Sequence, residues 1–318
     1  AEDGIRDRDV TGVQTCALPI SGSPCFNGTT VGVRNPNFAA ILQREFDANA
    51  NYNSLQLQTK KRFSHGYDLN MVYQFARTMD IQSGIGGSTD FVNITSFSMD
   101  PDDLGRDYGR AAFDIRHYLS LSGTYELPGA TLGGAAGQVL GGWRLSGSLS
   151  ASSGEPFSVT NRFDQAGNNV RIFGFQERPN LAPGASANPT EGTTAGCSFQ
   201  GASIAAGQEL GTPDRWFDPC AFQLQRAGTM GNLGRNTLQG PMLLGWDMAV
   251  LKDFTVTESS RIEFRWELFN ILNRPNFGSP NFNVFSSGTG TTPGALASQI
   301  TSTRTSARQM QFALKFIF

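Results

Sequence analysis

Four aspartates in the stretch "DPDDLGRD" are the residues that could most readily take part in chemistry: Asp100, Asp102, Asp103 and Asp107. Carboxylate oxygens are preferred ligands of Ca²⁺, so an exposed loop of this composition could hold a calcium ion. The stretch lacks the glycine and final glutamate spacing of an EF-hand, and Arg106 and Arg110 lie close by in the chain. We therefore favour a solvated loop in which arginines pair with these aspartates over a metal site.

No catalytic group of residues accompanies this cluster. The two histidines, His65 and His117, fall in an expected turn and at an expected strand end, too far apart to share a metal ion or a catalytic triad. The sequence contains no glycine-rich phosphate loop, zinc-ligand spacing or nucleophile elbow. We therefore predict no enzymatic activity and no cofactor.

The first twenty residues need separate treatment. The stretches "AEDGIRD" and "VTGVQTCALPI" resemble the translation of an indexed adapter used in short-read DNA sequencing. A secretory signal peptide would need a longer apolar run behind a basic segment. We interpret residues 1–20 as non-native, expect the native chain to be truncated upstream, and exclude these residues from fold reasoning.

Charge excludes one class of partner. Without residues 1–20 the chain has 23 basic residues (25 minus 2) and 23 acidic residues (27 minus 4), so its net charge is about zero. The chain therefore lacks the excess of basic residues that nucleic-acid binding usually requires. The 37 glycines and 24 phenylalanines, with many small polar residues, favour numerous strands joined by polar loops.

Seven segments alternate between apolar and polar residues, which is the period of a strand with two unlike faces. In "RIEFRWELF", Ile262, Phe264 and Trp266 oppose Glu263 and Arg265. Large aromatics on one face and charged residues in mid-strand on the other suit a wall between lipid and a water-filled lumen. No run has the apolar length of a membrane helix. The segments are 54–63, 67–76, 116–127, 143–151, 246–254, 261–269 and 308–318.

The connections between these segments alternate in length. The long ones cover about 77–114, 153–243 and 271–307, and the others are much shorter. Short turns at one end and long loops at the other are typical of an outer-membrane barrel whose long loops are extracellular. We predict an all-β fold: an antiparallel up-and-down transmembrane β-barrel segment of about seven strands. Residues 52–318 would form an open fragment of a larger barrel, residues 21–51 a partial extracellular loop, and 153–243 the least ordered part.

Strand direction predicts an aromatic belt. If the short turns are periplasmic, four aromatic residues fall at the same depth near the periplasmic end, where Phe318 also lies. Taken singly, each could be an ordinary core aromatic, but their shared depth favours the belt. They are Tyr67, Tyr125, Trp143 and Phe254.

Several motifs resemble the C-terminal barrel region of TonB-dependent outer-membrane receptors, most closely the Oar-like subgroup, whose members carry an N-terminal carboxypeptidase-regulatory-like domain. The resemblance covers about residues 34–318 and departs at Arg274, where the family more often has histidine. No plug domain or TonB box is present. The motifs include "RDYGRAAFDIRHYLSLSGTYELP", "SGEPFSV", "RWFDPCAF", "GTMGNLGRNTLQGP" and "FRWELFNILNRPNF".

This resemblance implies a receptor in the outer membrane of a Gram-negative bacterium that imports a scarce solute such as a carbohydrate or siderophore. The implied partners are outer-membrane lipid, an extracellular ligand, the barrel-assembly machinery, and the TonB complex acting through missing N-terminal parts. A passive porin and a secreted all-β binding domain are the alternatives. The last strand resembles the signal read by the assembly machinery through Phe312, Leu314, Phe316 and Phe318.

Two cysteines lie in the longest loop. An oxidising exterior would allow Cys197 and Cys220 to form a disulfide. Cys25 is then left without a partner in this sequence, and Cys16 belongs to the adapter-like segment.

Overall fold

The computed structural model describes residues 48–83, 98–100, 103–129, 134–161, 163–166, 177–199, 202–257, 259–285 and 294–318. The adapter-like segment, most of the loop expected over 21–51, Cys25 and Asp102 lie outside the described residues.

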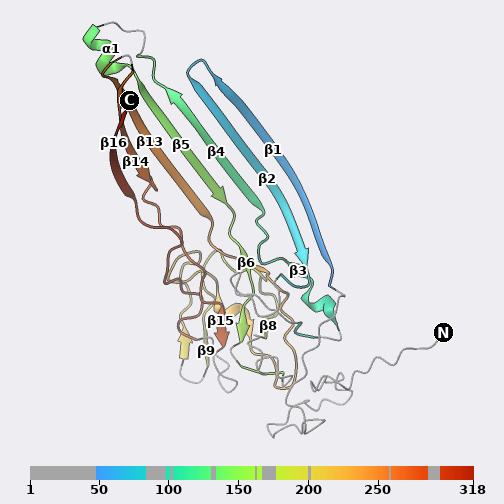
Figure 1. Ribbon diagram of the computed structural model, residues 1–318. Coiled ribbons are helices and arrows are strands. Elements are labelled where there is room, and N and C mark those ends of the chain that lie inside the picture. Colours follow the sequence, from blue (N-terminus) through green and yellow to red (C-terminus); the bar gives the residue numbers. More distant parts are fainter. Residues whose placement is uncertain are drawn as a thin grey trace, which may run out of the picture.

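Seven long strands form one antiparallel sheet in which each strand pairs with the next one along the chain (Figure 1). This is the predicted up-and-down arrangement. The strand β1 begins at Ala50, two residues before the boundary at 52 that the alternation suggested. The short strand β3 (Gly109–Arg110) adds to the loop end of β2. The long strands are β1 (Ala50–Ser64), β2 (Tyr67–Asp80), β4 (His117–Glu126), β5 (Trp143–Ser152), β13 (Leu243–Thr255), β14 (Arg261–Phe269) and β16 (Gln309–Ile317).

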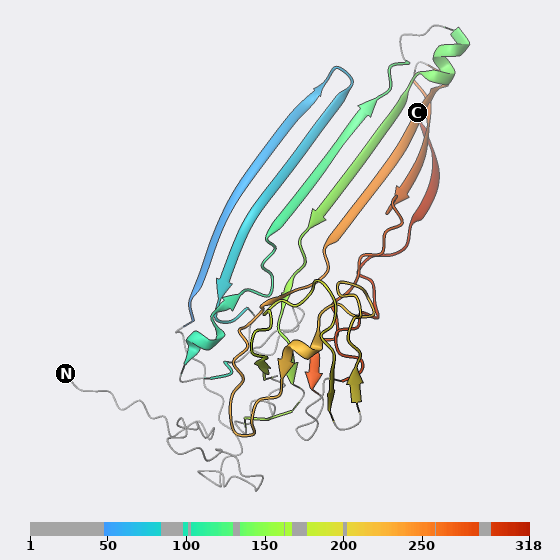
Figure 2. The same cartoon turned by 180° about the vertical axis from the view of Figure 1, so that it is seen from behind.

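The sheet is open. Among the described residues β1 and β16 do not pair, and the two views in Figures 1 and 2 place them at opposite edges of one curved sheet. Each edge leaves a row of unpaired backbone groups that a closed barrel would satisfy. The sheet is therefore an all-β barrel segment, as predicted, and not a closed barrel.

Strand register sorts the side chains into two faces. Tyr73, Leu119 and Ala151 lie opposite one another on adjacent strands, and Phe312 lies opposite Trp266 on the same face. The apolar side chains of β16 have no cover, since Leu314 is 74% and Phe312 67% exposed. An apolar surface of this kind is stable only against lipid or another apolar body.

One face assignment from the sequence is wrong. Alternation placed Phe63 on the face of Leu55 and Leu57, but the register of β1 against β2 shifts between Lys61 and Ser64. An irregularity of this kind interrupts the period of two, so the alternation cannot be carried through it to Phe63.

The short connections lie at one end of the sheet (Figure 1). The turn between β1 and β2 consists of His65 and Gly66, both with positive φ, as a two-residue hairpin requires. The link before β5 contains a short helix, α1 (Gly134–Leu140), that the alternation did not predict. Its glycine content hides it, since glycine weakens helices. The Trp143 indole donates a hydrogen bond to the Val139 carbonyl at 2.8 Å and satisfies a group at the helix end.

At the opposite end the described parts of the three long connections form a folded body, which we call the loop assembly (residues 98–116, 153–242 and 270–308). We predicted that 153–243 would be the least ordered part, but its described residues form small strands and a core of their own. Its small elements are β6 (Pro156–Phe157) with β12 (Leu238–Gln239), β7 (Thr160–Asn161) with β15 (Asn283–Phe285), β8 (Asn180–Leu181) with β11 (Phe222–Gln223), β9 (Cys197–Phe199) with β10 (Ala202–Ile204), η1 (Leu104–Asp107) and η3 (Pro219–Ala221).

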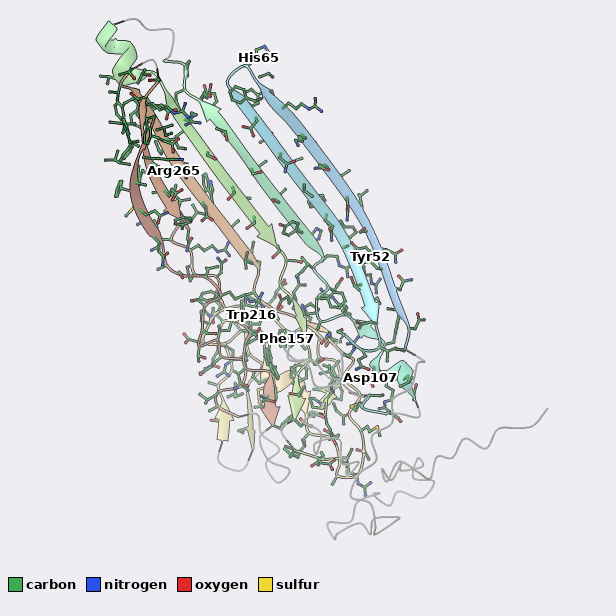
Figure 3. All side chains as sticks on the ribbon, in the orientation of Figure 1. Tyr52, His65, Asp107, Phe157, Trp216 and Arg265 are labelled. Carbon is green, nitrogen blue, oxygen red and sulfur yellow. A yellow bond between two sulfur atoms is a disulfide. The ribbon has the colours of Figure 1, made fainter. Side chains whose placement is uncertain are left out.

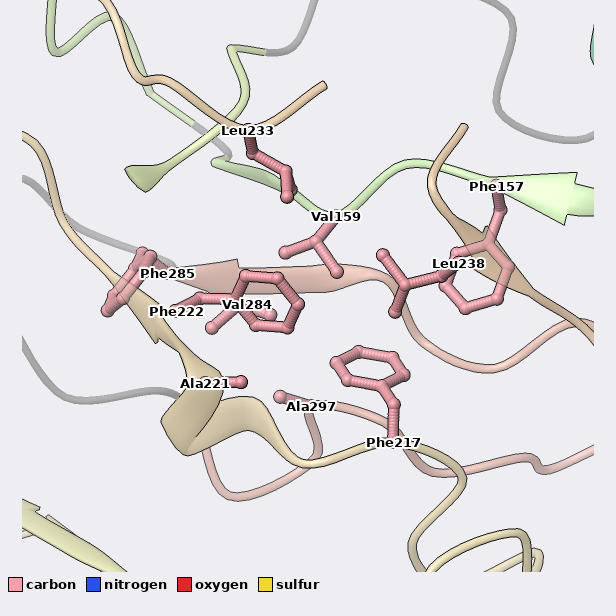
Figure 4. Packing of buried hydrophobic residues seen from close by; sticks show 10 residues of the cluster. All are labelled: Phe157, Val159, Phe217, Ala221, Phe222, Leu233, Leu238, Val284, Phe285 and Ala297. Carbon is pink, nitrogen blue, oxygen red and sulfur yellow. The ribbon is translucent and has the colours of Figure 1, made fainter. Parts of the chain in front are cut away.

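The loop assembly has its own hydrophobic core (Figure 4). Phe157, Phe217 and Leu238 come from the second long connection, and Val284 and Phe285 come from the third. All five side chains are buried, and the rings of Phe157 and Phe217 lie 5.8 Å apart. These apolar residues are scattered without a period, so no strand or helix pattern revealed them.

Candidate functional site

The aspartates of the proposed calcium loop have other partners. Asp107 is 1% exposed, and its carboxylate accepts hydrogen bonds from Arg178 at 2.7 Å and from the amide of Met99 at 2.8 Å. Asp103 caps η1, and Asp100 lies 3.7 Å from Arg106. Within the described ranges no three metal-ligating side chains gather at one place. An arginine does pair with each of Asp100 and Asp107, but Asp107 is buried rather than solvated and its partner is Arg178.

Arg110 does not join these aspartates. Its guanidinium donates to Asp114 at 2.8 Å, and Asp114 also accepts from the amide of Thr78 on β2. This pairing fixes the segment before β4 to the loop end of β2.

Two buried arginines join the long connections to the sheet. Arg178 pairs with Asp107, and Arg235 pairs with Asp80 at the end of β2 and donates to the Asp107 carbonyl at 2.7 Å. We call these four residues the arginine–aspartate cluster; Asp107 is labelled in Figure 3. Burial lowers the pKa of Arg178, and the neighbouring Asp107 opposes this change. Sequence reasoning missed both arginines, because isolated charges in long loops carry no periodic signal.

Glu177 is another buried ionisable residue in the loop assembly. Its carboxylate accepts hydrogen bonds from the amides of Gln165 and Ala166 and from the Gln225 side chain, each at 3.0 Å. Burial, with a contribution from neighbouring Asp164, raises the pKa of Glu177 to about 8, although the two amides oppose the shift. The group is therefore protonated in the folded protein near neutral pH.

The loop assembly should lose stability as the pH rises from about 4.5 to about 8. Unfolding returns Glu177 to its ordinary pKa of 4.5, so in this window the folded state holds a proton that the unfolded state has lost. The stabilisation by this proton is complete below pH 4.5 and is lost as the pH rises past about 8. Limited proteolysis at several pH values measures this contribution, as the ratio of the cleavage rate of the Glu177→Gln variant to that of the unchanged protein. The exposed Glu191→Gln is the control, and a pH-independent ratio would contradict the expectation.

Cys197 and Cys220 are joined by a disulfide with their Cα atoms 5.6 Å apart. The bond connects β9 to η3, where the adjacent Ala221 is part of the hydrophobic core. The disulfide thus ties an outer hairpin of the loop assembly to its interior.

The polar face of the sheet carries a network of charges. Arg144 on β5 lies 3.0 Å from Asp253 on β13 and 3.2 Å from Glu263 on β14. Arg265, labelled in Figure 3, pairs with Glu263 and Glu267. Charged side chains in mid-strand are costly against lipid, so this face must border water.

Two lysines lie on the apolar face near the turn end. The Lys61 ammonium lies 3.4 Å from the centre of the Tyr67 ring, and Lys252 lies 5.6 Å from the Trp143 ring and 5.1 Å from the Phe254 ring. Lys252 also donates to the Gly141 carbonyl beyond the strand end. Lysines whose stems lie on apolar surface and whose heads contact interfacial aromatics are typical of a membrane boundary.

The aromatic residues at this end shift regularly along the strands. Tyr67, Tyr125 and Phe312 lie in one register row with Leu145 and Val250. Relative to that row, Trp143 is two, Phe254 four and Phe318 six residues nearer the turn end. Strands about 4.8 Å apart and tilted by about 35–45° shift by about one residue per strand. The shift supports our proposal of a belt at one depth.

The model of the outer membrane beta barrel domain family matches residues 15–311. The chain belongs to this family. No curated protein and no solved structure matches it. The barrel therefore lies in the outer membrane of a Gram-negative bacterium. This location excludes the alternative of a secreted all-β binding domain. None of the helices in the described ranges has the length and apolar character to cross a membrane.

The histidines of the barrel occupy opposite ends of the strands. His65 lies in the turn between β1 and β2 (Figure 3), and His117 begins β4 at the loop end. His117 Nδ1 is 2.9 Å from the Tyr73 hydroxyl. The two histidines are not brought together.

Proposed function

We propose that this barrel segment is the C-terminal part of a TonB-dependent outer-membrane receptor of the Oar-like subgroup, which imports a scarce solute. The proposed ligand is a carbohydrate, a siderophore or a similar molecule bound first by the loop assembly. The proposed partners are the TonB complex, acting through N-terminal parts, and the barrel-assembly machinery, which would recognise Phe312, Leu314, Phe316 and Phe318 on the last strand.

The observation that carries this proposal is the union of the long connections in one folded body. The core joins the second and third connections, and Arg178 and Arg235 join the second to the first. Loops held on a rigid scaffold present a defined binding surface, which a receptor needs and a general diffusion pore does not.

The barrel size that the resemblance implies adds support. The edge strands β1 and β16 of the seven-stranded sheet do not pair with each other, so closure of the barrel needs further strands (Figure 2). Barrels of about 22 strands are plugged transporters, whereas those of about 16–18 strands are open porins. The barrel of about 22 strands that the resemblance implies, together with the ordered exterior, therefore favours an energised receptor over a passive porin.

Conductance of the complete protein tests the proposal. We expect the intact receptor, reconstituted in a planar bilayer, to show no stable conductance because a plug domain fills its lumen. Deletion of the plug, which we expect upstream of residue 21 in the uninterrupted gene, should open a large pore. A stable channel from the intact protein, or an upstream reading frame without a plug and TonB box, would instead favour the passive porin.

A further inference from the structure

The short helix α1 ends in an exposed apolar pair. It lies at the turn end of the sheet, beside the ends of β5 and β13 (Figures 1 and 2). Its last two residues, Val139 and Leu140, are 64% and 54% exposed. Phe254 and Val256 at the neighbouring end of β13 are also exposed. Apolar residues that gather at one end of a molecule mark an interaction surface.

Two side chains place the end of α1 on the lipid-facing side of the sheet. Trp143 lies opposite Lys252 on β13, and Lys252 lies opposite Phe264 on β14, so the three share that face. The Trp143 indole donates to the Val139 carbonyl at 2.8 Å, and the Lys252 ammonium donates to the Gly141 carbonyl. Because both donors point out from the lipid-facing side, the end of α1 lies on that side and not over the lumen.

The same contacts set the depth of the helix end. A tryptophan in an aromatic belt turns its ring to lipid and its N–H to the wet layer of the interface. At Trp143 the Val139 carbonyl takes the place of that water. The Lys252 side chain, 2% exposed, is likewise covered by the end of α1 and by the rings of Trp143 and Phe254. The end of α1 therefore lies at the depth of the belt.

Backbone contacts hold the helix end at this depth. The Asp253 amide donates to the Gly142 carbonyl at 3.2 Å, and the Leu127 amide donates to the Trp143 carbonyl at 2.9 Å. A Cβ at residue 129 would collide with the Leu140 carbonyl, so this close approach requires Gly129. The exposed pair is thus presented by a fixed segment.

Charge favours lipid over a soluble partner. The sequence has no charged residue between Glu126 and Arg144, a stretch that includes all of α1. The turn between β13 and β14 at the same end does carry a charge, Glu258. Surfaces that meet water normally mix charges of both signs, whereas charged side chains are costly against an apolar layer.

We propose that the end of α1 is a membrane contact of the periplasmic rim, in which Val139 and Leu140 enter the interfacial layer of the periplasmic leaflet. Continuity with the lipid-facing wall and its aromatic belt identifies the lipid surface as the occupant. The contact depends on the barrel and its membrane setting alone, so it does not require the proposed import function.

Collisions of a spin label with two quenchers test this contact. The complete protein is reconstituted in phosphatidylcholine vesicles without any other protein, and a nitroxide label is attached to Val139→Cys or to Leu140→Cys. Oxygen concentrates in the apolar layer, whereas a neutral nickel chelate stays mainly in water. The ratio of oxygen to nickel collisions should be severalfold higher at both positions than in a water-exposed turn. The second position keeps the test available if one variant does not fold.

Ser259→Cys is the matched control, because Ser259 is exposed in the turn between β13 and β14 at the same end of the sheet. The unchanged protein, treated with the same label, gives the background from its own cysteines. Migration of unheated samples as the compact form confirms that each variant is folded. A ratio at either folded α1 position as low as that at Ser259 would place the side chain in water and overturn the membrane contact. The apolar surface would then be free for a periplasmic protein.

Discussion

Replacing Phe312 with arginine should abolish stable folding of the barrel in the outer membrane. Phe312 lies on the lipid-facing side of β16, six residues from Phe318 at the turn end, and therefore near the middle of the apolar band. Its ring stacks on Trp266 at 5.8 Å between centres. A cation at this depth costs about 2–4 kcal/mol. Loss of the aromatic pair adds about 0.5–1.5 kcal/mol.

The adjacent residue supplies the matched control for this prediction. Gln311 lies on the opposite face, where its side chain donates to Glu267. Gln311→Arg places the same charge beside a carboxylate that borders water, so the barrel should fold normally. The measurement is the fraction of protein in the outer membrane that migrates as a compact form without heating. Equal compact fractions for Phe312→Arg and Gln311→Arg would contradict the assignment of the two faces.

Replacing Asp107 with alanine should unfold the loop assembly and leave the sheet intact. The substitution leaves the buried Arg178 guanidinium without its carboxylate, for which the expected cost is about 3–5 kcal/mol. Hydrogen exchange should therefore rise throughout the loop assembly by two to three powers of ten, roughly, and remain slow in the long strands. Exchange measured by mass spectrometry on the membrane-embedded protein reports both regions.

Two further variants identify the cause of that change. Asp100→Ala removes a more exposed and longer ion pair with Arg106 and should cost no more than about 1 kcal/mol. Asp107→Asn combined with Arg178→Met removes both charges and should restore much of the protection, because no buried charge is left unpaired. If the double variant exchanges as fast as Asp107→Ala, packing rather than charge holds the loop assembly.

The strands could be predicted from the sequence because their two faces border different solvents. Lipid on one side and water on the other demand alternation, and this is visible in "RIEFRWELF" without any knowledge of neighbours. The order of the strands could also be predicted, because short turns join adjacent antiparallel strands. The shift at Lys61 in β1 could not be read, because an irregularity leaves no mark in a pattern that already mixes polar and apolar residues.

The loop assembly could not be predicted for the opposite reason. Its core gathers Val159, Phe217 and Val284 from distant stretches, and each contributes one or two apolar residues without a period. Asp107 shows why the candidate site could not be predicted. An aspartate that binds calcium and an aspartate in a buried ion pair can have the same neighbours in the sequence. Only Arg178, 71 positions away in the chain, decides between them.

The unequal lengths of the strands give the outer rim of this barrel segment a slope. From Tyr67 to Asp80 the strand β2 extends thirteen residues above the aromatic belt, whereas from Phe318 back to Gln309 the last strand extends nine. The wall on the side of β2 therefore stands higher by about four residues, or about 13 Å along the strand. Arg235 fastens the loop assembly to that higher wall, and the third long connection runs directly into the lower wall at β16, so the loop assembly is attached at both ends of the slope.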